Sequence, residues 1–284
     1  MIIKQKVMAI GAHADDIEVI AGGTLAKAKD QGYEIVYIMA TNNFSGGWSR
    51  VKPDGKIESR TPPYFEIMPQ RKIEAEAAAN ALGTHAIHLD FPQRHYKDKD
   101  GKKVQLCYGC PLPEGVPANA PTILNAYEDA ASVKRLTDMI LEHNPSCIIT
   151  LGLATANIEH FATAQLAVKC FWQAVEKGFR GALIMGREDY TAYGEINMRW
   201  DTFIDISDYL DKKMELIAKH ACQMPTAATD PDHGHRLRPL KWGAACGCRA
   251  AEVFTWVRRY DRPNLDSTDK YFSPLIEELI HNSR

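Results

Sequence analysis

The chain lacks a hydrophobic segment long enough to cross a membrane. No apolar run in its 284 residues approaches the roughly 20 residues that a membrane-spanning helix requires. Residues 1–6 lead directly into a short apolar run, which leaves no room for a signal peptide. We therefore expect a cytoplasmic protein that does not associate with a membrane.

An excess of charge or of cysteine is absent as well. The formal net charge is −2, so there is no electrostatic reason to expect a nucleic-acid partner. Seven cysteines are an odd number, which is unpromising for a disulfide framework and favours reduced thiols. The G-x-G-x-x-G pattern of dinucleotide-binding sites is missing too. Only Gly22-Gly23 occurs, after an acidic cluster that would repel phosphates.

The order of apolar and polar segments predicts an α/β fold. An apolar run at 7–10, a helix at 22–30 and a strand at 34–40 form a βαβ unit, which predicts parallel strands. Further helices are expected at 70–82, 133–143, 162–177 and 208–222, and strands at 86–89, 147–151, 202–206 and 252–257. We expect a single domain over 1–284, a Rossmann-like three-layer sandwich with a mostly parallel sheet. Gly- and Pro-rich loop insertions are expected at about 41–69, 91–127 and 224–249.

Polar residues directly follow the first predicted strand. His13, Asp15 and Asp16 stand in the turn where ligands bind in open α/β sheets. Histidine beside carboxylates is a common set of metal ligands, and the two aspartates can have different roles. The alternative is that an aspartate only caps the next helix.

A second polar cluster follows the strand predicted at 147–151. Asn157, Glu159 and His160 lie between that strand and a helix, so this loop can meet the first one at the carboxyl edge of the sheet. His13, Asp16 and His160 would then be three metal ligands with one position open to water, as in catalytic zinc sites. Alternatively, His160 is a surface residue at a helix start. Two histidines and a carboxylate also form the iron triad of oxygenases, but those usually lack a βαβ pattern.

Several motifs together resemble the LmbE-like, or PIG-L, zinc-dependent de-N-acetylases. The first motif of that family reads Ala-His-Pro-Asp-Asp, and residues 12–16 here read Ala-His-Ala-Asp-Asp. Other family-like segments follow in the expected order: Gly22-Gly23-Thr24-Leu25-Ala26, Arg71-x-x-Glu74, Leu82-Gly83, Leu89-Asp90-Phe91-Pro92, Asp205-Ile206-Ser207-Asp208, Lys212-Lys213, His220-Ala221-Cys222-Gln223 and Ala251-Glu252-Val253-Phe254. The resemblance covers most of the chain.

The resemblance implies an amidase that removes the N-acetyl group of an amino sugar or sugar conjugate, such as an N-acetylglucosaminide. It implies one Zn²⁺ per chain, or another divalent metal, held by His13, Asp16 and His160. Asp15 would be the general base, and Arg71 would lie near the reacting acyl group. The alternative for Arg71 is a helix-surface ion pair with Glu74, one turn away.

The chain departs from the family at two positions. Ala14 replaces a proline, which should only loosen the turn. Asn157 replaces the first histidine of the family motif His-Pro-Asp-His, the residue thought to stabilise or protonate the tetrahedral intermediate. An asparagine amide can donate a hydrogen bond to an oxyanion but not a proton near neutral pH. Either another histidine replaces it, or the chain is a catalytically weakened or non-catalytic sugar-binding protein. The candidate replacements are His220, His233 and His235.

Other residues are weaker candidates for substrate contacts or metal binding. Aromatic and basic loop residues, and His220, are candidate sugar contacts, although Trp48 and Tyr96 could equally pack the loops: Trp48, Arg50, Arg94, His95, Tyr96. Long loops could also form contacts in a homo-oligomer. The pairs Cys107/Cys110 and Cys246/Cys248 invite a four-thiolate zinc site, but the second spacing is unusual and free thiols are the better expectation.

Overall fold

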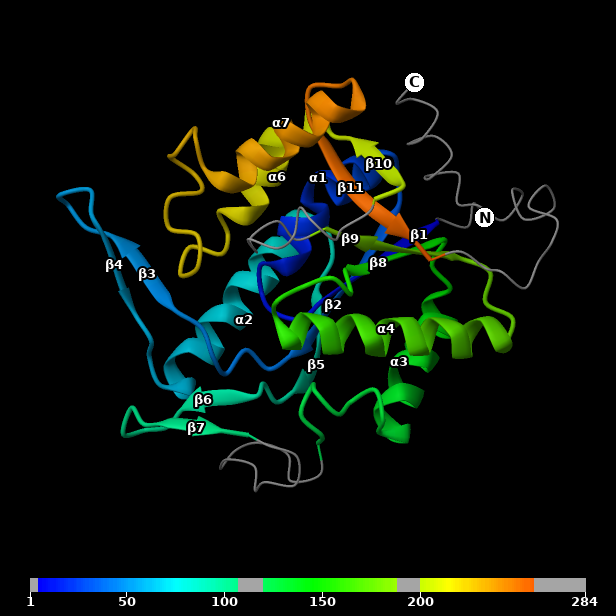
Figure 1. The fold of residues 1–284 in the computed structure, drawn as a ribbon, viewed down its shortest axis with the longest axis horizontal. Helices are drawn as coiled ribbons and strands as arrows, with labels where there is room; N and C mark the ends of the chain where they lie inside the picture. Colours follow the sequence, from blue (N-terminus) through cyan, green and yellow to red (C-terminus); the bar gives the residue numbers. More distant parts are fainter. Residues whose placement is uncertain (1–4, 107–119, 188–199, 258–284) are drawn as a thin grey trace.

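The computed structural model describes residues 5–106, 120–187 and 200–257, and its centre is a seven-stranded sheet (Figure 1). The strands lie in the order β10-β11-β9-β8-β1-β2-β5. Their bounds are β1 Lys6–Gly11, β2 Glu34–Thr41, β5 Ala86–Phe91, β8 Cys147–Leu151, β9 Ala182–Gly186, β10 Thr202–Asp205 and β11 Ala251–Trp256. All pairings from β9 to β5 are parallel, whereas β11 runs antiparallel to both β9 and β10. The predicted mostly parallel sheet is therefore confirmed.

Helices cover both faces of this sheet. The long helices are α1 Asp16–Asp30, α2 Tyr64–Ala81, α3 Ala130–His143, α4 Ile158–Glu176, α6 Leu210–Ile217 and α7 Gly234–Cys246, with a 3₁₀ turn η1 at Ser207–Tyr209. Alternate residues of β1 point to opposite faces, as strand geometry requires. Val7 and Ala9 join a core with residues of α1 and α6, while Met8 and Ile10 join a second core with residues of α3 and α4. The result is the expected α/β sandwich of three layers.

Two helices contain glycines and extend over residues that were not predicted to be helical. The first helix was expected from residue 22, but α1 begins at Asp16 and contains Gly22 and Gly23. A Cβ at Gly23 would lie 2.7 Å from Cδ1 of Ile206, so the glycine allows a close helix contact. Likewise α7 lies inside the region expected as a loop at 224–249, and a Cβ at Gly243 would lie 2.5 Å from the backbone nitrogen of Ala250. These glycines serve packing rather than chain reversal.

The other two regions expected as loops contain hairpins. Strands β3 (Trp48–Val51) and β4 (Ile57–Arg60) pair within 41–69, and β6 (His95–Lys97) pairs with β7 (Lys103–Gln105) within 91–127. Helix α2 begins at Tyr64 and includes Pro69, earlier than the expected start at residue 70. Strand β9 was not predicted, because a short apolar run fits a buried strand and a buried helix equally well.

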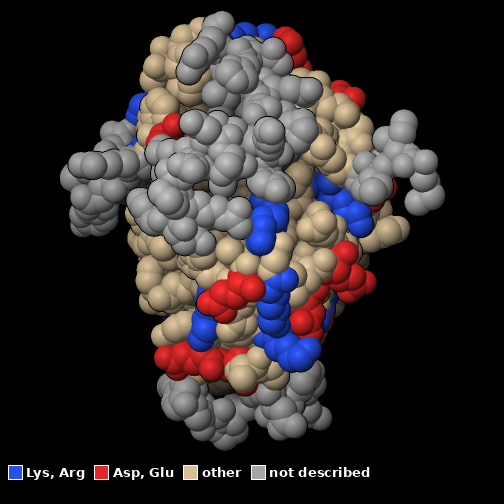
Figure 2. Space-filling model, turned by 90° about the vertical axis from the view of Figure 1, so that its right-hand side faces the viewer, with Lys and Arg blue, Asp and Glu red and all other residues tan. Residues whose placement is uncertain are grey.

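The surface carries both charge signs. Figure 2 shows lysine and arginine interspersed with aspartate and glutamate on one described face. Within the described ranges, no helix is both long enough and apolar enough to cross a membrane.

Candidate active site

Two loops at one edge of the sheet carry the residues of interest. Strands β1 and β8 are parallel neighbours, with Val7 opposite Cys147 and Ile10 opposite Thr150. Both strands therefore end at the same edge, where β1 passes into the turn before α1 and β8 into the loop before α4. This neighbouring register brings residues that are far apart in the sequence to one place.

His13, Asp16 and His160 converge there, and we call them the His–Asp–His cluster. Nδ1 of His13 lies 3.0 Å from Nε2 of His160 and 3.4 Å from an Asp16 carboxylate oxygen, and Nε2 of His160 lies 3.2 Å from the other. All three residues are buried. The ligand atoms of a tetrahedral zinc, with bonds of about 2.0–2.2 Å, are separated by about 3.3–3.6 Å. The donor types and their spacing therefore fit a divalent cation.

Electrostatics within the cluster reflect the close approach of these groups. Burial alone would raise the pKa of Asp16, but the nearby His160 and His13 outweigh it and hold that pKa well below its usual range. Burial would lower the pKa of His13, yet Asp16 and Glu159 raise it.

Glu159 fixes the orientation of His13 from the opposite side of the ring. Its Oε2 lies 2.7 Å from Nε2 of His13, so Nδ1 is the nitrogen that faces the cluster. Gln93 Nε2 and the Arg94 backbone N–H also donate to Glu159, at 3.0 and 2.7 Å. Burial would raise the pKa of Glu159, but the contact with His13 and these donors lower it to about 2. A carboxylate behind a metal-binding histidine sets its tautomer and increases its basicity.

Asp15 is held by Arg71 in a strained backbone conformation. Its φ of 118° lies in a region that residues other than glycine rarely adopt. Arg71 Nη2 contacts Asp15 Oδ2 at 3.2 Å and donates to the Ala14 carbonyl at 2.5 Å, while Nη1 donates to the Ser45 carbonyl at 3.2 Å. Burial raises the pKa of Asp15, although Arg71 opposes that shift. Strain of this kind is common where a side chain must be aimed at a reaction.

This geometry decides between the alternatives for both residues. Asp15 stands at the N-cap position of α1, but its side chain makes no capping hydrogen bond. Arg71 is only 4% exposed and contacts the turn of Asp15. Glu74 instead accepts hydrogen bonds from Gln70 and from the backbone N–H of Cys222. The alternative prediction, an ion pair between Arg71 and Glu74 on the helix surface, is therefore wrong.

Asn157 both caps α4 and lines the cavity. Its Oδ1 accepts a hydrogen bond from the Glu159 backbone N–H at 3.0 Å. Since an amide oxygen only accepts, the Nδ2 amide group is the part of this side chain that can donate to a bound molecule.

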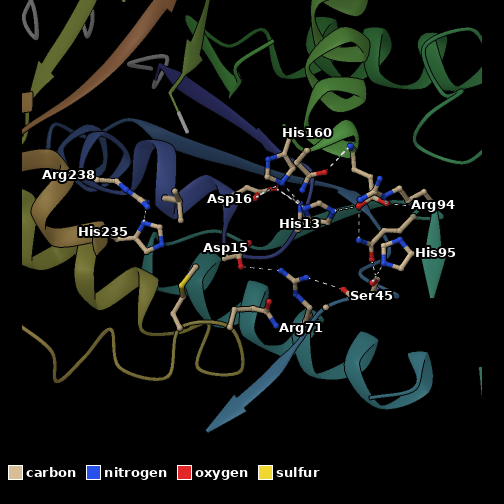
Figure 3. Close-up of a pocket in the computed structure, with 17 residues that line it drawn as sticks. His13, Asp15, Asp16, Ser45, Arg71, Arg94, His95, His160, His235 and Arg238 are labelled. Carbon is tan, nitrogen blue, oxygen red and sulfur yellow. Dashed lines mark hydrogen bonds and ion pairs between the residues drawn. The ribbon is translucent and has the colours of Figure 1, made fainter. Parts of the chain in front are cut away.

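A cavity of about 430 Å³ opens over the His–Asp–His cluster. Besides the cluster, Asp15, Arg71, Asn157 and Glu159, several residues of other segments line it: Ser45, Gln93, Arg94, His95, Met224, His235 and Arg238. Figure 3 shows His235 and Arg238 on one side of the cluster, Arg94 and His95 on the other, and Arg71 beside Asp15. The cavity thus combines the candidate metal centre, a carboxylate with a raised pKa and several cationic side chains.

A family model described as PIG-L: GlcNAc-PI de-N-acetylase matches residues 8–171, more than half of the 284-residue chain. The chain belongs to this family. The match includes β1, the turn with Asp15 and Asp16, and the loop with His160. The family assignment therefore covers both loops that form the His–Asp–His cluster.

Three known proteins illustrate how far the likeness extends. Diacetylchitobiose deacetylase of Thermococcus kodakarensis is 33% identical over 88 residues, which are 31% of this chain and only 29% of that relative. The structure of N,N'-diacetylchitobiose deacetylase from Pyrococcus horikoshii is 19% identical, with a TM-score of 0.62 over 93% of this chain and 88% of that one. A 4-carboxy-2-hydroxymuconate hydratase from Pseudomonas putida is also 19% identical, with a TM-score of 0.60 over 92% of this chain and 99% of that one. At such identity the two structures establish a shared fold.

Not all residues singled out in this PIG-L family chain reach the cavity. Arg94 and His95 line it, but Trp48 lies at the start of β3, where the guanidinium of Arg60 stacks on its ring at 5.1 Å. Tyr96 packs with Phe44 in a small core. Trp48 and Tyr96 therefore pack the hairpins, and Arg50 pairs with Glu58 on the exposed face of one of them.

The three histidines considered as substitutes for the missing motif histidine also have different surroundings. His220 is fully buried, pairs with Glu18 at 2.9 Å and is not among the residues that line the cavity. His233 accepts a hydrogen bond from the His235 backbone N–H at the start of α7. Only His235 lines the cavity, and burial, followed by Arg238 and Lys213, lowers its pKa to about 3. His235 is therefore neutral near pH 7.

Sequence reasoning did not assign a role to several lining residues. Glu159 stood beside a candidate ligand, which was a usable signal for its contact with His13. Arg238 and Gln93 carried no such signal because they lie in regions read as loops. Cys107 and Cys110 lie outside the described residues, and Cys246 and Cys248 are half-buried free thiols.

Proposed function

We propose that this protein is a metal-dependent hydrolase that removes an N-acyl group, such as acetyl, from an amino sugar or sugar conjugate. The observation that carries the proposal is the convergence of the His–Asp–His cluster beside Asp15 in one cavity. Membership of the de-N-acetylase family and the deacetylase names of two relatives support the reaction class. A divalent cation such as zinc, held by the cluster, would supply a water of lowered pKa and polarise the substrate carbonyl.

The side chains of the cavity can carry the proton transfers. Asp15 accepts a proton from the water that attacks the amide carbonyl, while Arg71 holds this carboxylate in place. The Nδ2 amide N–H of Asn157 donates a hydrogen bond to the developing oxyanion. The carbon–nitrogen bond then breaks, and the products are acetate and a free amine.

The leaving nitrogen needs a proton, and Asp15 is its best source. Among the described residues that line the cavity, burial lowers the pKa of both His95 and His235, so neither is protonated near pH 7. Burial raises the pKa of Asp15. We therefore propose that Asp15 returns the proton it has taken from water, so that one carboxylate serves as both base and acid.

Addition of water to an activated carbon–carbon double bond is a second candidate. Asn157 cannot protonate a leaving amine, and the P. putida protein of the same fold is a hydratase. In such a reaction Asp15 would take one proton from water, the remaining hydroxyl would bond to carbon, and the proton would return to the neighbouring carbon. No leaving group requires protonation.

Product analysis on zinc-loaded protein tests the first proposal against the second. We expect acetate release from N-acetylglucosaminides, loss of release after chelation, and recovery when zinc is restored. Hydration of an unsaturated dicarboxylic acid without any acetate release would overturn the hydrolase and favour the hydratase. Saturable sugar binding with neither reaction would mark a non-catalytic binding protein.

A further inference from the structure

The end of strand β2 contacts the turn that carries Asp15. Strands β1 and β2 are parallel neighbours, so β2 ends beside the turn that follows β1. Both the backbone N–H and the hydroxyl of Thr41, the last residue of β2, donate to the Ala12 carbonyl, at 3.0 and 2.7 Å. Asn43 lies two residues further along the chain, and like Thr41 it is fully buried. The segment after β2 therefore packs directly against the turn.

Asn43 fixes the peptide group that precedes Ala14. Its Oδ1 accepts a hydrogen bond from the Ala14 backbone N–H at 2.9 Å, and its Nδ2 donates to the Thr41 carbonyl at 3.4 Å. The φ of Asn43 is 59°, in the left-handed region that asparagine tolerates better than most residues. Ala14 is fully buried, where an unpaired N–H would cost free energy, so this turn depends on the Asn43 acceptor.

Asn43 and Arg71 hold Ala14 from its two sides. Asn43 accepts from the N–H of this residue, and Nη2 of Arg71 donates to its carbonyl at 2.5 Å. The two peptide groups that precede Asp15 are therefore both fixed by side chains from other elements. An unusual backbone conformation such as the φ of 118° at Asp15 persists only when its surroundings determine it. Asn43 supplies one of the contacts that do so.

The family motif has a proline where this chain has Ala14. A proline ring restricts φ, and proline has no N–H that needs an acceptor. Alanine lacks the ring and brings a buried N–H. In this chain the hydrogen bond to Asn43 meets both requirements, because it pairs the N–H and restrains the turn. A side chain of the neighbouring strand end thus does here what a ring does in the motif.

We propose that Asn43 is a positioning residue, which aims Asp15 at the attacking water by holding the Ala14 amide. This inference rests on the proposed function. Asn43 is not among the residues that line the cavity, so it acts through the turn rather than on the substrate. Its loss should therefore lower kcat and leave KM nearly unchanged.

Asn43→Gly removes the acceptor and keeps a residue that adopts the left-handed conformation readily. We expect kcat for acetate release at saturating zinc to fall by about 10- to 100-fold, since a small displacement of a catalytic group has an effect of this size. Exchange of the Ala14 amide hydrogen, measured by NMR, should become faster. Asn144→Gly is the matched control, because Asn144 also has a left-handed φ, of 44°, and is exposed at the end of α3. It should change neither value.

Ala14→Pro distinguishes positioning of Asp15 from a general loss of packing. Alone, its ring would meet the Asn43 oxygen that lies 2.9 Å from the Ala14 nitrogen, so this variant should be the least active of the set or fail to fold. Combined with Asn43→Gly, the ring has space and needs no acceptor, so the double variant should regain most of the lost kcat. A double variant no more active than Asn43→Gly would overturn the inference, as would an unchanged kcat in Asn43→Gly.

Amide exchange on metal-free protein separates this inference from the reaction, because it requires no turnover. The Asp16 N–H donates to the His13 carbonyl at 3.2 Å within the same turn, and it is present in every variant. Faster exchange of this amide in Asn43→Gly that Ala14→Pro reverses, in a protein that hydrolyses no N-acetyl compound, would support the role of Asn43 in the turn and overturn the hydrolase. Unchanged exchange of both the Ala14 and Asp16 amides in Asn43→Gly, with acetate release intact, would overturn the inference and support the hydrolase.

Discussion

Two polar clusters contact helix α1, one at its start and one at its middle, and they differ in the source of their positive charge. At its start, Asp16 faces His13 and His160, and no described lysine or arginine forms an ion pair with it. Further along, the backbone and hydroxyl of Thr24 donate to Glu252, which also pairs with Lys213 at 2.5 Å. We call the latter group the Lys–Glu cluster. Lys213 also donates to two carbonyls of α1.

The difference separates a structural ion pair from the proposed cation site. The Lys–Glu cluster contains its own cation, and its members are almost completely buried, so it holds α1, α6 and β11 together. The His–Asp–His cluster has converging donor atoms but no permanent cation of its own, and it opens into a cavity. Two similarly buried clusters that contact the same helix therefore have different chemistry.

Asp15→Asn should produce the largest effect, and it tests the site beside the His–Asp–His cluster. An amide keeps the size of the side chain but cannot take a proton from water, so kcat should fall by about 10²- to 10⁴-fold. Steady-state acetate release measures the loss, and zinc analysis should show unchanged metal content. Full activity of this variant would remove Asp15 from the mechanism.

Lys213→Met tests the Lys–Glu cluster. Loss of the lysine leaves Glu252 buried without its cation, which should reduce the free energy of unfolding by about 3–5 kcal/mol. Urea unfolding measures this, with Lys212→Met as control because Lys212 is exposed and pairs with Glu215 on the same helix. Zinc stoichiometry should not change in the folded protein. Loss of zinc with intact stability would contradict the comparison.

Glu159→Gln should weaken metal binding without destroying it. The carboxylate that orients His13 becomes an amide, and the loss of such a contact typically reduces metal affinity by about 10- to 100-fold. Competition with a chromogenic chelator measures the dissociation constant. Glu176→Gln, at the exposed far end of α4, should leave it unchanged.

The smallest effect concerns pH. The folded pKa of His235 is about 3, below the ordinary value of 6.5, so the unfolded chain binds one more proton between those values. Stability from this residue is complete above about pH 6.5 and declines as pH falls, by up to about 1.4 kcal/mol per unit. Urea unfolding between pH 7.5 and 5 should show a shallower decline for His235→Gln than for the exposed control His85→Gln. Parallel curves would contradict a neutral buried His235.

The sequence was sufficient to predict the sheet edge and the closeness of His13, Asp16 and His160. Each residue follows an apolar run, and parallel neighbouring strands end together, so local pattern and topology agree. The contacts of Arg71 with Asp15 and of Arg238 with His235 were not predictable in this way. They depend on where α2 and α7 pack against the sheet. Both helices also include proline or glycine, residues that are typical of loops in a sequence. Tertiary packing, rather than local propensity, decides those positions.

The positive φ of Asp15 has a consequence for the evolution of this turn. Glycine would adopt the same backbone conformation with less strain, so the backbone alone does not favour an aspartate here. Its presence means that the chain accepts a local conformational penalty in exchange for a carboxylate at that point. Asp15→Gly should accordingly relieve the backbone strain but lose both the reaction and the ion pair with buried Arg71.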